Sequence, residues 1–264
     1  MSRWLVTFAP SWVLLIGLIV VITGGAVLIQ RYVRRRYPAL TGDEHNDVTK
    51  FTYSFIGFVY AFFIGFVVSS MWGQINTADA NAHAEGAAAV QMANDSVVFD
   101  ATDTDRIRHA LLTYTQAAVT EWSQAGDAHS PEAGSALARL YTAYQQVQTK
   151  TDTQKTFLAT SLSNLDKISQ ARTVRLITAR DDTGPPWPLW AVIFLTSGLV
   201  LGTAIIYGVE KPVLHYPMVA VVGVIVATNL FLVLELAHPY VGVISTSSNS
   251  LQEAVRVLSQ PAPS

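Results

Sequence analysis

The sequence predicts an all-α membrane protein with four transmembrane helices and a helical soluble domain inserted between helices two and three. Half of the 264 residues are apolar and only 14% are charged, against about 25% charged residues in an average soluble protein. The charges are also distributed unevenly, so that four long stretches carry none. A membrane-crossing helix needs about 20 apolar residues, and each of these stretches is long enough.

The four predicted transmembrane helices lie at about 11–30, 51–72, 188–208 and 213–235. The first has an alternative interpretation as a signal peptide, with Arg3 in the n-region and an apolar core after it. Its apolar run is long, and no small-residue cleavage motif follows. An arginine cluster at its end is typical of a stop-transfer sequence, so we expect a retained helix. That cluster comprises Arg31, Arg34, Arg35 and Arg36.

The remaining segments follow from these helices. Residues 1–72 hold the first two helices and a basic loop at 31–50, and residues 185–238 hold the last two. A C-terminal tail covers residues 239–264. The insert at 73–184 holds 13 of the 19 acidic residues and 9 of the 17 basic residues, as expected for a domain in water. We therefore place one soluble domain in the middle of the chain.

Apolar residues in the insert recur at intervals of three and four, which predicts helices throughout. The second transmembrane helix is expected to continue past Trp72 through an alanine-rich stretch to about residue 98. Three aspartates then mark a turn that caps the next helix, Ser130-Pro131-Glu132 opens another, and a last helix runs from about Thr153 to Arg180. The three aspartates are Asp100, Asp103 and Asp105; they lack the glycine and distal glutamate of a calcium loop, so capping is favoured.

Lysine and arginine in short loops predict the orientation in the membrane, because such loops remain in the cytoplasm. Loop 31–50 carries four arginines and Lys50, and loop 209–216 carries Lys211, whereas the N-terminus has Arg3 alone. Both loops are therefore expected in the cytoplasm, with the insert and both termini outside.

The second transmembrane helix carries the residues with the clearest functional pattern. Gly57, Ala61, Gly65 and Ser69 are spaced by four and form a ridge of small residues that permits close helix packing. Phe58, Phe62 and Phe66 form a neighbouring column that would make a hydrophobic gate if it faced a shared pore axis. In the alternative interpretation, the column faces lipid or neighbouring helices. Gly198 and Gly202 form a GxxxG pair, which we assign to packing.

Polar groups inside a membrane are costly, so Asn229 and Glu235 are candidate functional residues. Asn229 is expected to make an interhelical hydrogen bond, and Glu235 to lie either among headgroups or at a pore mouth. In the insert, Arg172 and Arg175 lie on one side of a helix and can pair with Glu85 or Glu121. His83 and Glu85 point in different directions and do not make a metal site.

Several functions are excluded or disfavoured by composition. A net charge of −2 gives no basic face for nucleic acid, and the absence of cysteine excludes disulfides and thiolate ligands. No catalytic, metal or cofactor motif is present. We therefore expect a protein that is not an enzyme, binds no metal or cofactor, and has the lipid bilayer and copies of itself as partners.

The order of these parts resembles the bestrophin-like membrane protein family over about residues 50–258. The resemblance rests on FVYAFFIGFVVSSMWGQINTADANAHAEGAAAV and LELAHPYVGVISTSSNSLQEAV. Its most telling positions are Gly57, Gly65, Trp72, Glu85, Arg172, Arg175, Pro185, Pro239, Tyr240, Gly242 and Leu251.

The resemblance implies a pentameric ion channel whose pore is lined by the second helix and narrowed by an apolar neck at the phenylalanine column. Two features depart from the family pattern. The chain lacks the acidic calcium clasp of the eukaryotic channels, and the family arrangement would place the insert in the cytoplasm. The leading hypothesis is an oligomeric ion channel or pore; the alternative is a non-catalytic membrane-anchored sensor or scaffold whose insert binds a protein.

Overall fold

The computed structural model describes residues 10–37, 46–123, 131–180, 184–206 and 212–260. The chain divides into two compact units. The membrane unit comprises residues 1–73, 183–238 and 242–244, and the insert unit comprises residues 74–182, 239–241 and 245–264. The predictions for Arg3 and Lys211 and for the loop segments 38–45 and 207–211 lie outside the described residues.

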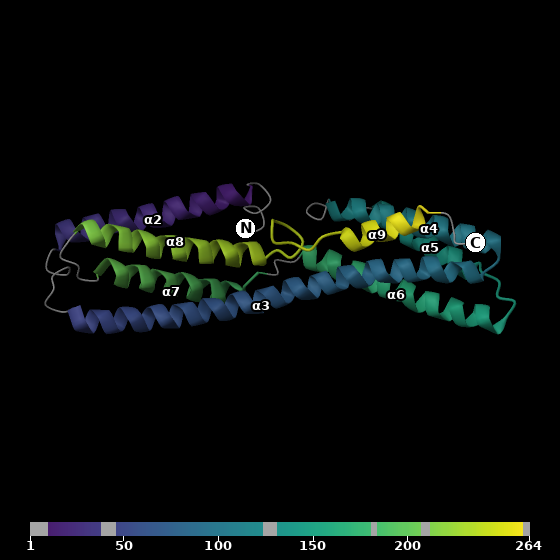
Figure 1. Ribbon diagram of the computed structural model, residues 1–264, viewed down its shortest axis with the longest axis horizontal. Helices are drawn as coiled ribbons and strands as arrows, with labels where there is room; N and C mark the ends of the chain where they lie inside the picture. Colours follow the sequence, from purple (N-terminus) through teal and green to yellow (C-terminus); the bar gives the residue numbers. More distant parts are fainter. Residues whose placement is uncertain (1–9, 38–45, 124–130, 181–183, 207–211, 261–264) are drawn as a thin grey trace. The chain divides into compact units, whose positions relative to one another are not determined.

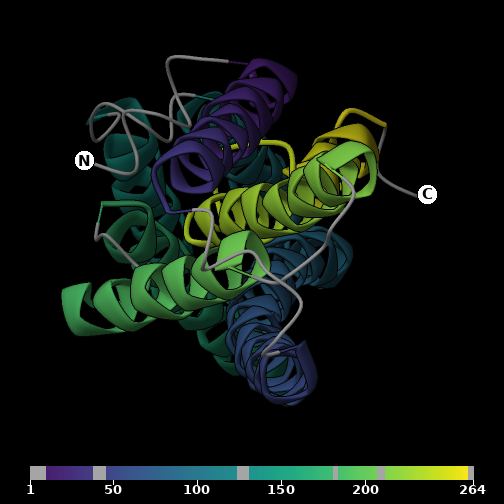
Figure 2. The same cartoon turned by 90° about the vertical axis from the view of Figure 1, so that its left-hand side faces the viewer.

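The described residues form eight α-helices, and four of these are long and apolar enough to cross a membrane. They are α2 (Ser11–Arg36), α3 (Asn46–Asp95), α7 (Trp187–Ile206) and α8 (Pro212–Leu236). The four helices expected from the sequence are therefore confirmed as elements. In the membrane unit α8 packs along α2 and against α7, and α3 lies on the side away from α2 (Figures 1 and 2).

The close approach between α2 and α8 depends on a glycine that the sequence analysis did not single out. A Cβ at Gly223 would lie 3.0 Å from the Cα of Thr23, so the absence of a side chain lets the two backbones meet. At Gly198 and Gly202 of α7 an added Cβ would meet no atom within 4 Å. The GxxxG pair therefore takes no part in packing within the described residues, and its role in packing stays a prediction for contacts outside the chain.

A polar contact joins three helices of the membrane unit. His215 is fully buried in α8 and lies 2.8 Å from the Arg34 guanidinium of α2 and 3.1 Å from the Ala204 carbonyl oxygen of α7. Position 215 falls where the predicted basic loop, 209–216, and the predicted fourth helix, 213–235, overlap, and α8, which begins at Pro212, includes it. Gln30 on α2 is also fully buried, and its amide has no hydrogen-bond partner among the described residues.

The insert unit contains the end of α3, a short 3-10 helix at Ser96–Val98, α4 (Ala101–Ser123), α5 (Pro131–Gln145), α6 (Asp152–Arg180) and α9 (Asn249–Leu258). Helix α3 does continue through the alanine-rich stretch, as predicted, and α4, α5 and α6 begin within a residue or two of their predicted starts. The apolar positions at intervals of three and four form the core. Its fully buried members include Met92, Ile107, Leu111, Tyr114, Leu140, Leu165, Ile168 and Leu251.

Helix α9 belongs to this core although the sequence analysis described residues 239–264 only as a tail. Its Leu251, Ala254 and Leu258 are buried, and it packs against α4. At its N-terminus the Ser250 hydroxyl donates a hydrogen bond of 2.7 Å to the Ala82 carbonyl of α3. Its buried positions recur at intervals of three and four on an otherwise polar helix of ten residues, so the sequence carried the pattern of an amphipathic helix there, and the prediction of a tail did not use it.

Candidate functional site

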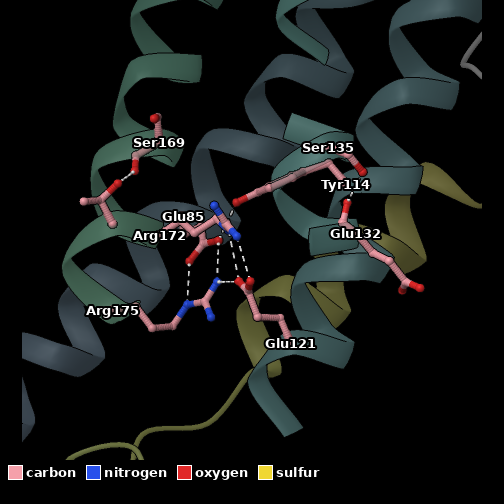
Figure 3. Close-up of polar contacts among 9 residues, drawn as sticks. Glu85, Tyr114, Glu121, Glu132, Ser135, Ser169, Arg172 and Arg175 are labelled. Carbon is pink, nitrogen blue, oxygen red and sulfur yellow. Dashed lines mark hydrogen bonds and ion pairs between the residues drawn. The ribbon is translucent and has the colours of Figure 1, made fainter. Parts of the chain in front are cut away.

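Four charged side chains meet in the interior of the insert unit, where α3, α4 and α6 come together (Figure 3). Glu85 comes from α3, Glu121 from α4, and Arg172 and Arg175 from α6. Glu85 and Glu121 are each 1% exposed and Arg175 is 2% exposed. We call these four residues the buried charge cluster.

The guanidinium groups engage both carboxylates. Arg172 donates from Nε and Nη2 to the two oxygens of Glu121, at 3.0 and 2.7 Å. Arg175 lies 3.4 Å from each oxygen of Glu85 and donates from Nη2 to Glu121 at 3.3 Å. The two positive and two negative charges compensate one another, as burial requires. The ion pairs expected from the sequence are thus present, and one arginine joins both carboxylates.

Aromatic side chains complete the surroundings of the cluster. The Tyr114 hydroxyl donates to Glu85 at 2.7 Å, and the Arg175 guanidinium lies 4.8 Å from the Trp122 ring centroid. Trp122 packs edge to face on Tyr240 and donates to the Thr246 carbonyl. Burial and the Glu85 charge raise the pKa of Tyr114 well above its usual range, and burial raises the pKa of Tyr240 to about 12. Both phenols are therefore neutral at physiological pH, and that of Tyr114 is the hydrogen-bond donor to Glu85.

This arrangement is suited to holding helices together. Burial alone would lower the pKa of Arg175, but Glu85 opposes that effect and the pKa is raised, so the arginine stays charged. Each of the two carboxylates accepts a hydrogen bond from at least one guanidinium group. Elsewhere within the described ranges, no three His, Cys, Asp or Glu side chains are grouped so as to hold a metal ion. His83 is exposed whereas Glu85 is buried, in agreement with the prediction that the two point in different directions. His83 instead pairs with Asp79 at 3.3 Å, a contact that was not predicted.

The phenylalanine column lies on the outside of the chain. Phe58, Phe62 and Phe66 are 69%, 72% and 69% exposed, and together they form one face of α3. The opposite stripe of the same helix is buried within the membrane unit and comprises Tyr60, Ile64, Val67 and Met71. The three rings therefore do not pack into the core that the described residues form. They can contact lipid, another copy of the chain or the lumen of a pore.

The ridge of small residues lies beside that column on the exposed part of α3. Ala61, Gly65 and Ser69 are exposed and Gly57 is half-buried, and a Cβ at either glycine would meet nothing within 4 Å. Trp72, at the end of the column, is half exposed. The close approach that these small residues permit is thus not used by any segment that the structure describes.

The polar residues of α8 lie in different settings. Asn229 is half-buried, whereas Glu235 is fully buried and its Oε2 accepts a hydrogen bond of 3.1 Å from the Val243 amide. The other oxygen of Glu235 has no hydrogen-bond partner among the described residues. Gly242 has a φ of 99°, a conformation that favours glycine. Glu235 thus fixes the position of the segment around Val243, which follows α8 in the chain.

Two residues that surround the cluster, Tyr114 and Trp122, lie eight residues apart in the apolar stripe of one helix, which marks them as core positions only. Their polar atoms gave no separate signal, because a tyrosine or tryptophan in a buried stripe looks the same whether or not it faces a charge. Gln30 was overlooked because it coincides with the predicted end of the first transmembrane helix, whereas α2 continues to Arg36.

Comparison with known proteins agrees with this architecture. The structure of a bacterial bestrophin homologue from Klebsiella pneumoniae, in one variant, superposes with a TM-score of 0.70 at 14% identity over 92% of this chain and 97% of that chain. A second variant gives 0.67 at 16% identity over 93% and 99%. A structure described as a membrane protein gives 0.68 at 13% identity over 92% and 97%. These TM-scores show a shared fold, whereas the identities are low.

Among curated proteins, none matches the chain in sequence. The bestrophin-like domain, however, matches residues 20–251, which is most of the chain. That span takes in the exposed phenylalanine column of α3, the buried charge cluster and the turn held by Glu235. The chain therefore belongs to the bestrophin-like domain family.

Proposed function

We propose that the chain assembles as a homo-oligomer in the cell membrane and forms a bestrophin-like ion channel or pore lined by α3. The observation that supports this proposal is the column of Phe58, Phe62 and Phe66, which is 69–72% exposed along one face of a predicted membrane helix. A row of apolar rings around a common axis can gate by dewetting. Four membrane helices are too few to enclose such an axis, so several copies are needed.

The neighbouring ridge of small residues also favours an oligomer. In lipid, helices associate through close van der Waals packing because apolar burial gives no net gain there. Gly57, Ala61, Gly65 and Ser69 offer a surface of this kind, and no part of the described chain occupies it. A second copy of α3 or α7 packed on this ridge would leave the adjacent phenylalanine column facing inward.

Replacement of one ring tests the proposed gate. Purified full-length protein in planar bilayers is expected to conduct, and Phe62→Ala is expected to change the single-channel conductance or open probability by severalfold. The reason is that a methyl group leaves the constriction wider and wetter than a phenyl ring. The matched control is Phe194→Ala, since Phe194 is also exposed but lies on α7. Silent bilayers together with a monomeric mass in native mass spectrometry would contradict the proposal.

The alternative function is a non-catalytic sensor or scaffold that binds a protein through the insert unit. It is favoured by one observation, that the insert unit has a hydrophobic core of its own. Affinity capture with the full-length chain in detergent distinguishes the two functions. A specific, stoichiometric partner combined with silent bilayers would support the alternative and exclude the channel.

The charge rule leads us to propose that the insert unit lies outside the cell. Because the chain has no cysteine, a single introduced cysteine reports its own location. We expect Ser163→Cys, exposed on α6, to react with a membrane-impermeant maleimide in intact cells. Thr41→Cys, in the basic segment between the first two spans, is the control and is expected to react only after permeabilisation. The reverse pattern would place the insert in the cytoplasm, as the family resemblance implies.

A further inference from the structure

A groove of about 580 Å³ runs along the outer surface between α4 and α5 in the insert unit. Its α4 wall is formed by Arg106, His109, Ala110 and Thr113, and its α5 wall by Arg139, Thr142, Ala143 and Gln146. No acidic side chain is among these lining residues, whereas two arginines and a histidine are. The groove shares no lining residue with the buried charge cluster.

The two helices run antiparallel, which sets the order of groups along the groove. Arg106 closes one end by donating to Gln146 at 2.8 Å. The alanines Ala110 and Ala143 form the apolar middle, and Arg139 lies at the other end beside Thr113. Positions 106 and 113 are seven residues apart, which corresponds to about 10 Å along a helix. The groove therefore has a cationic group at each end and a small apolar floor between them.

The two arginines differ in whether an acidic side chain of the protein already compensates their positive charge. Arg106 pairs with Asp103 one turn away, so much of its charge is compensated. Arg139 makes no ion pair or side-chain hydrogen bond within the described part of the chain. The hydroxyls of Thr113 and Thr142 donate to carbonyls of their own helices, so neither hydroxyl proton is free to bind an anion. Arg139 is thus the group with the greatest capacity to bind an anion.

From this arrangement we propose that the α4–α5 groove binds a small organic anion. Its phosphate or carboxylate head contacts Arg139, and its apolar body lies over Ala110 and Ala143. A guanidinium holds either head through paired, charge-assisted hydrogen bonds. The far end, with Arg106 and the Gln146 amide, accommodates a second polar group. This site lies outside the proposed pore face of α3 and does not depend on conduction.

Binding by the full-length protein in non-ionic detergent at low salt tests the site. AMP serves as the probe for an organic phosphate and hippurate for an organic carboxylate, each measured by equilibrium dialysis. At least one of the two probes is expected to bind saturably. If AMP is the preferred probe, adenosine and inorganic phosphate are each expected to bind more weakly than AMP, because each lacks one half of it. Arg139→Gln is expected to weaken binding of the preferred probe at least tenfold, and Ala110→Leu to abolish it by filling the floor.

Arg256→Gln is the matched control, because it removes the same charge from an exposed position on α9, and it is expected to leave the affinity unchanged. Each variant is used only if its melting temperature lies close to that of the unchanged protein. The proposal is overturned if neither probe binds at millimolar concentration, or if Arg139→Gln and Arg256→Gln weaken binding equally. It is also overturned if Arg139→Gln changes the mass of the oligomer while neither probe changes it, since a neighbouring copy of the chain would then occupy the groove.

Discussion

Arg175→Met is expected to destabilise the insert unit more than any other single side-chain replacement in the buried charge cluster. The methionine keeps an apolar side chain but removes the guanidinium and its contact with the Trp122 ring, so that Glu85 retains a carboxylate that is 1% exposed and only a tyrosine as partner. Removing one partner of a buried ion pair costs about 3–5 kcal/mol. For a chain of this size we expect the apparent melting temperature to fall by about 6–20 °C, as measured by size-exclusion thermostability in detergent.

A second replacement separates loss of the charge from loss of packing. In Glu85→Gln/Arg175→Met both charges are gone, and Arg172 still holds Glu121 through two hydrogen bonds. The double variant is therefore expected to be more stable than the sum of the single effects predicts, because no carboxylate is left without a cation. Arg256→Met, which breaks an exposed pair on α9, should change stability by about 0–1 kcal/mol. Equal losses for Arg175→Met and Arg256→Met would contradict the assigned role of the cluster.

The elements that could be predicted from sequence are those with a strong local signal. Each membrane helix carries an uninterrupted apolar stretch, and the helices of the insert carry apolar stripes at intervals of three and four. Even the continuation of α3 past Trp72 follows from local pattern, because the alanine-rich stretch after it contains no proline that would end a helix. The pairing of Arg172 and Arg175 with glutamates also follows, since charges on the inner side of a helix need partners.

The parts that could not be predicted depend on contacts between distant segments. Nothing local distinguishes Gly86 or Gly223 from other glycines, yet each lies where another backbone passes closely. By contrast, Gly198 and Gly202 have the spacing of a packing motif but meet nothing within the described residues. The choice among the two carboxylates for each arginine is likewise a matter of tertiary geometry. Pattern thus indicates which surfaces can pack, whereas the fold decides which of them do.

Gly86→Ala is the replacement expected to detach α9 from the insert unit. A Cβ at Gly86 would lie 2.6 Å from the backbone carbon and oxygen of Ser250, and backbone atoms cannot move aside as a flexible side chain can. The start of α9 must therefore shift, which breaks the hydrogen bond from the Ser250 hydroxyl to the Ala82 carbonyl and loosens the burial of Leu251. Hydrogen exchange across residues 249–258 is expected to speed up markedly, and the melting temperature to fall.

Whether Gly86→Ala stabilises or destabilises the protein depends on two opposing contributions to the free energy of unfolding. Alanine is favoured over glycine inside a helix by about 1 kcal/mol, whereas overpacking of a closely fitted contact costs about 1–3 kcal/mol. Gly134→Ala isolates the first of these, because its Cβ would meet only the Arg172 Nη2 at an ordinary 3.8 Å, and it should leave the protein as stable or more stable. At Gly86 the clash with backbone outweighs the gain in helix propensity. If Gly86→Ala matched Gly134→Ala in both stability and exchange, α9 would not be seated on α3 as the structure places it.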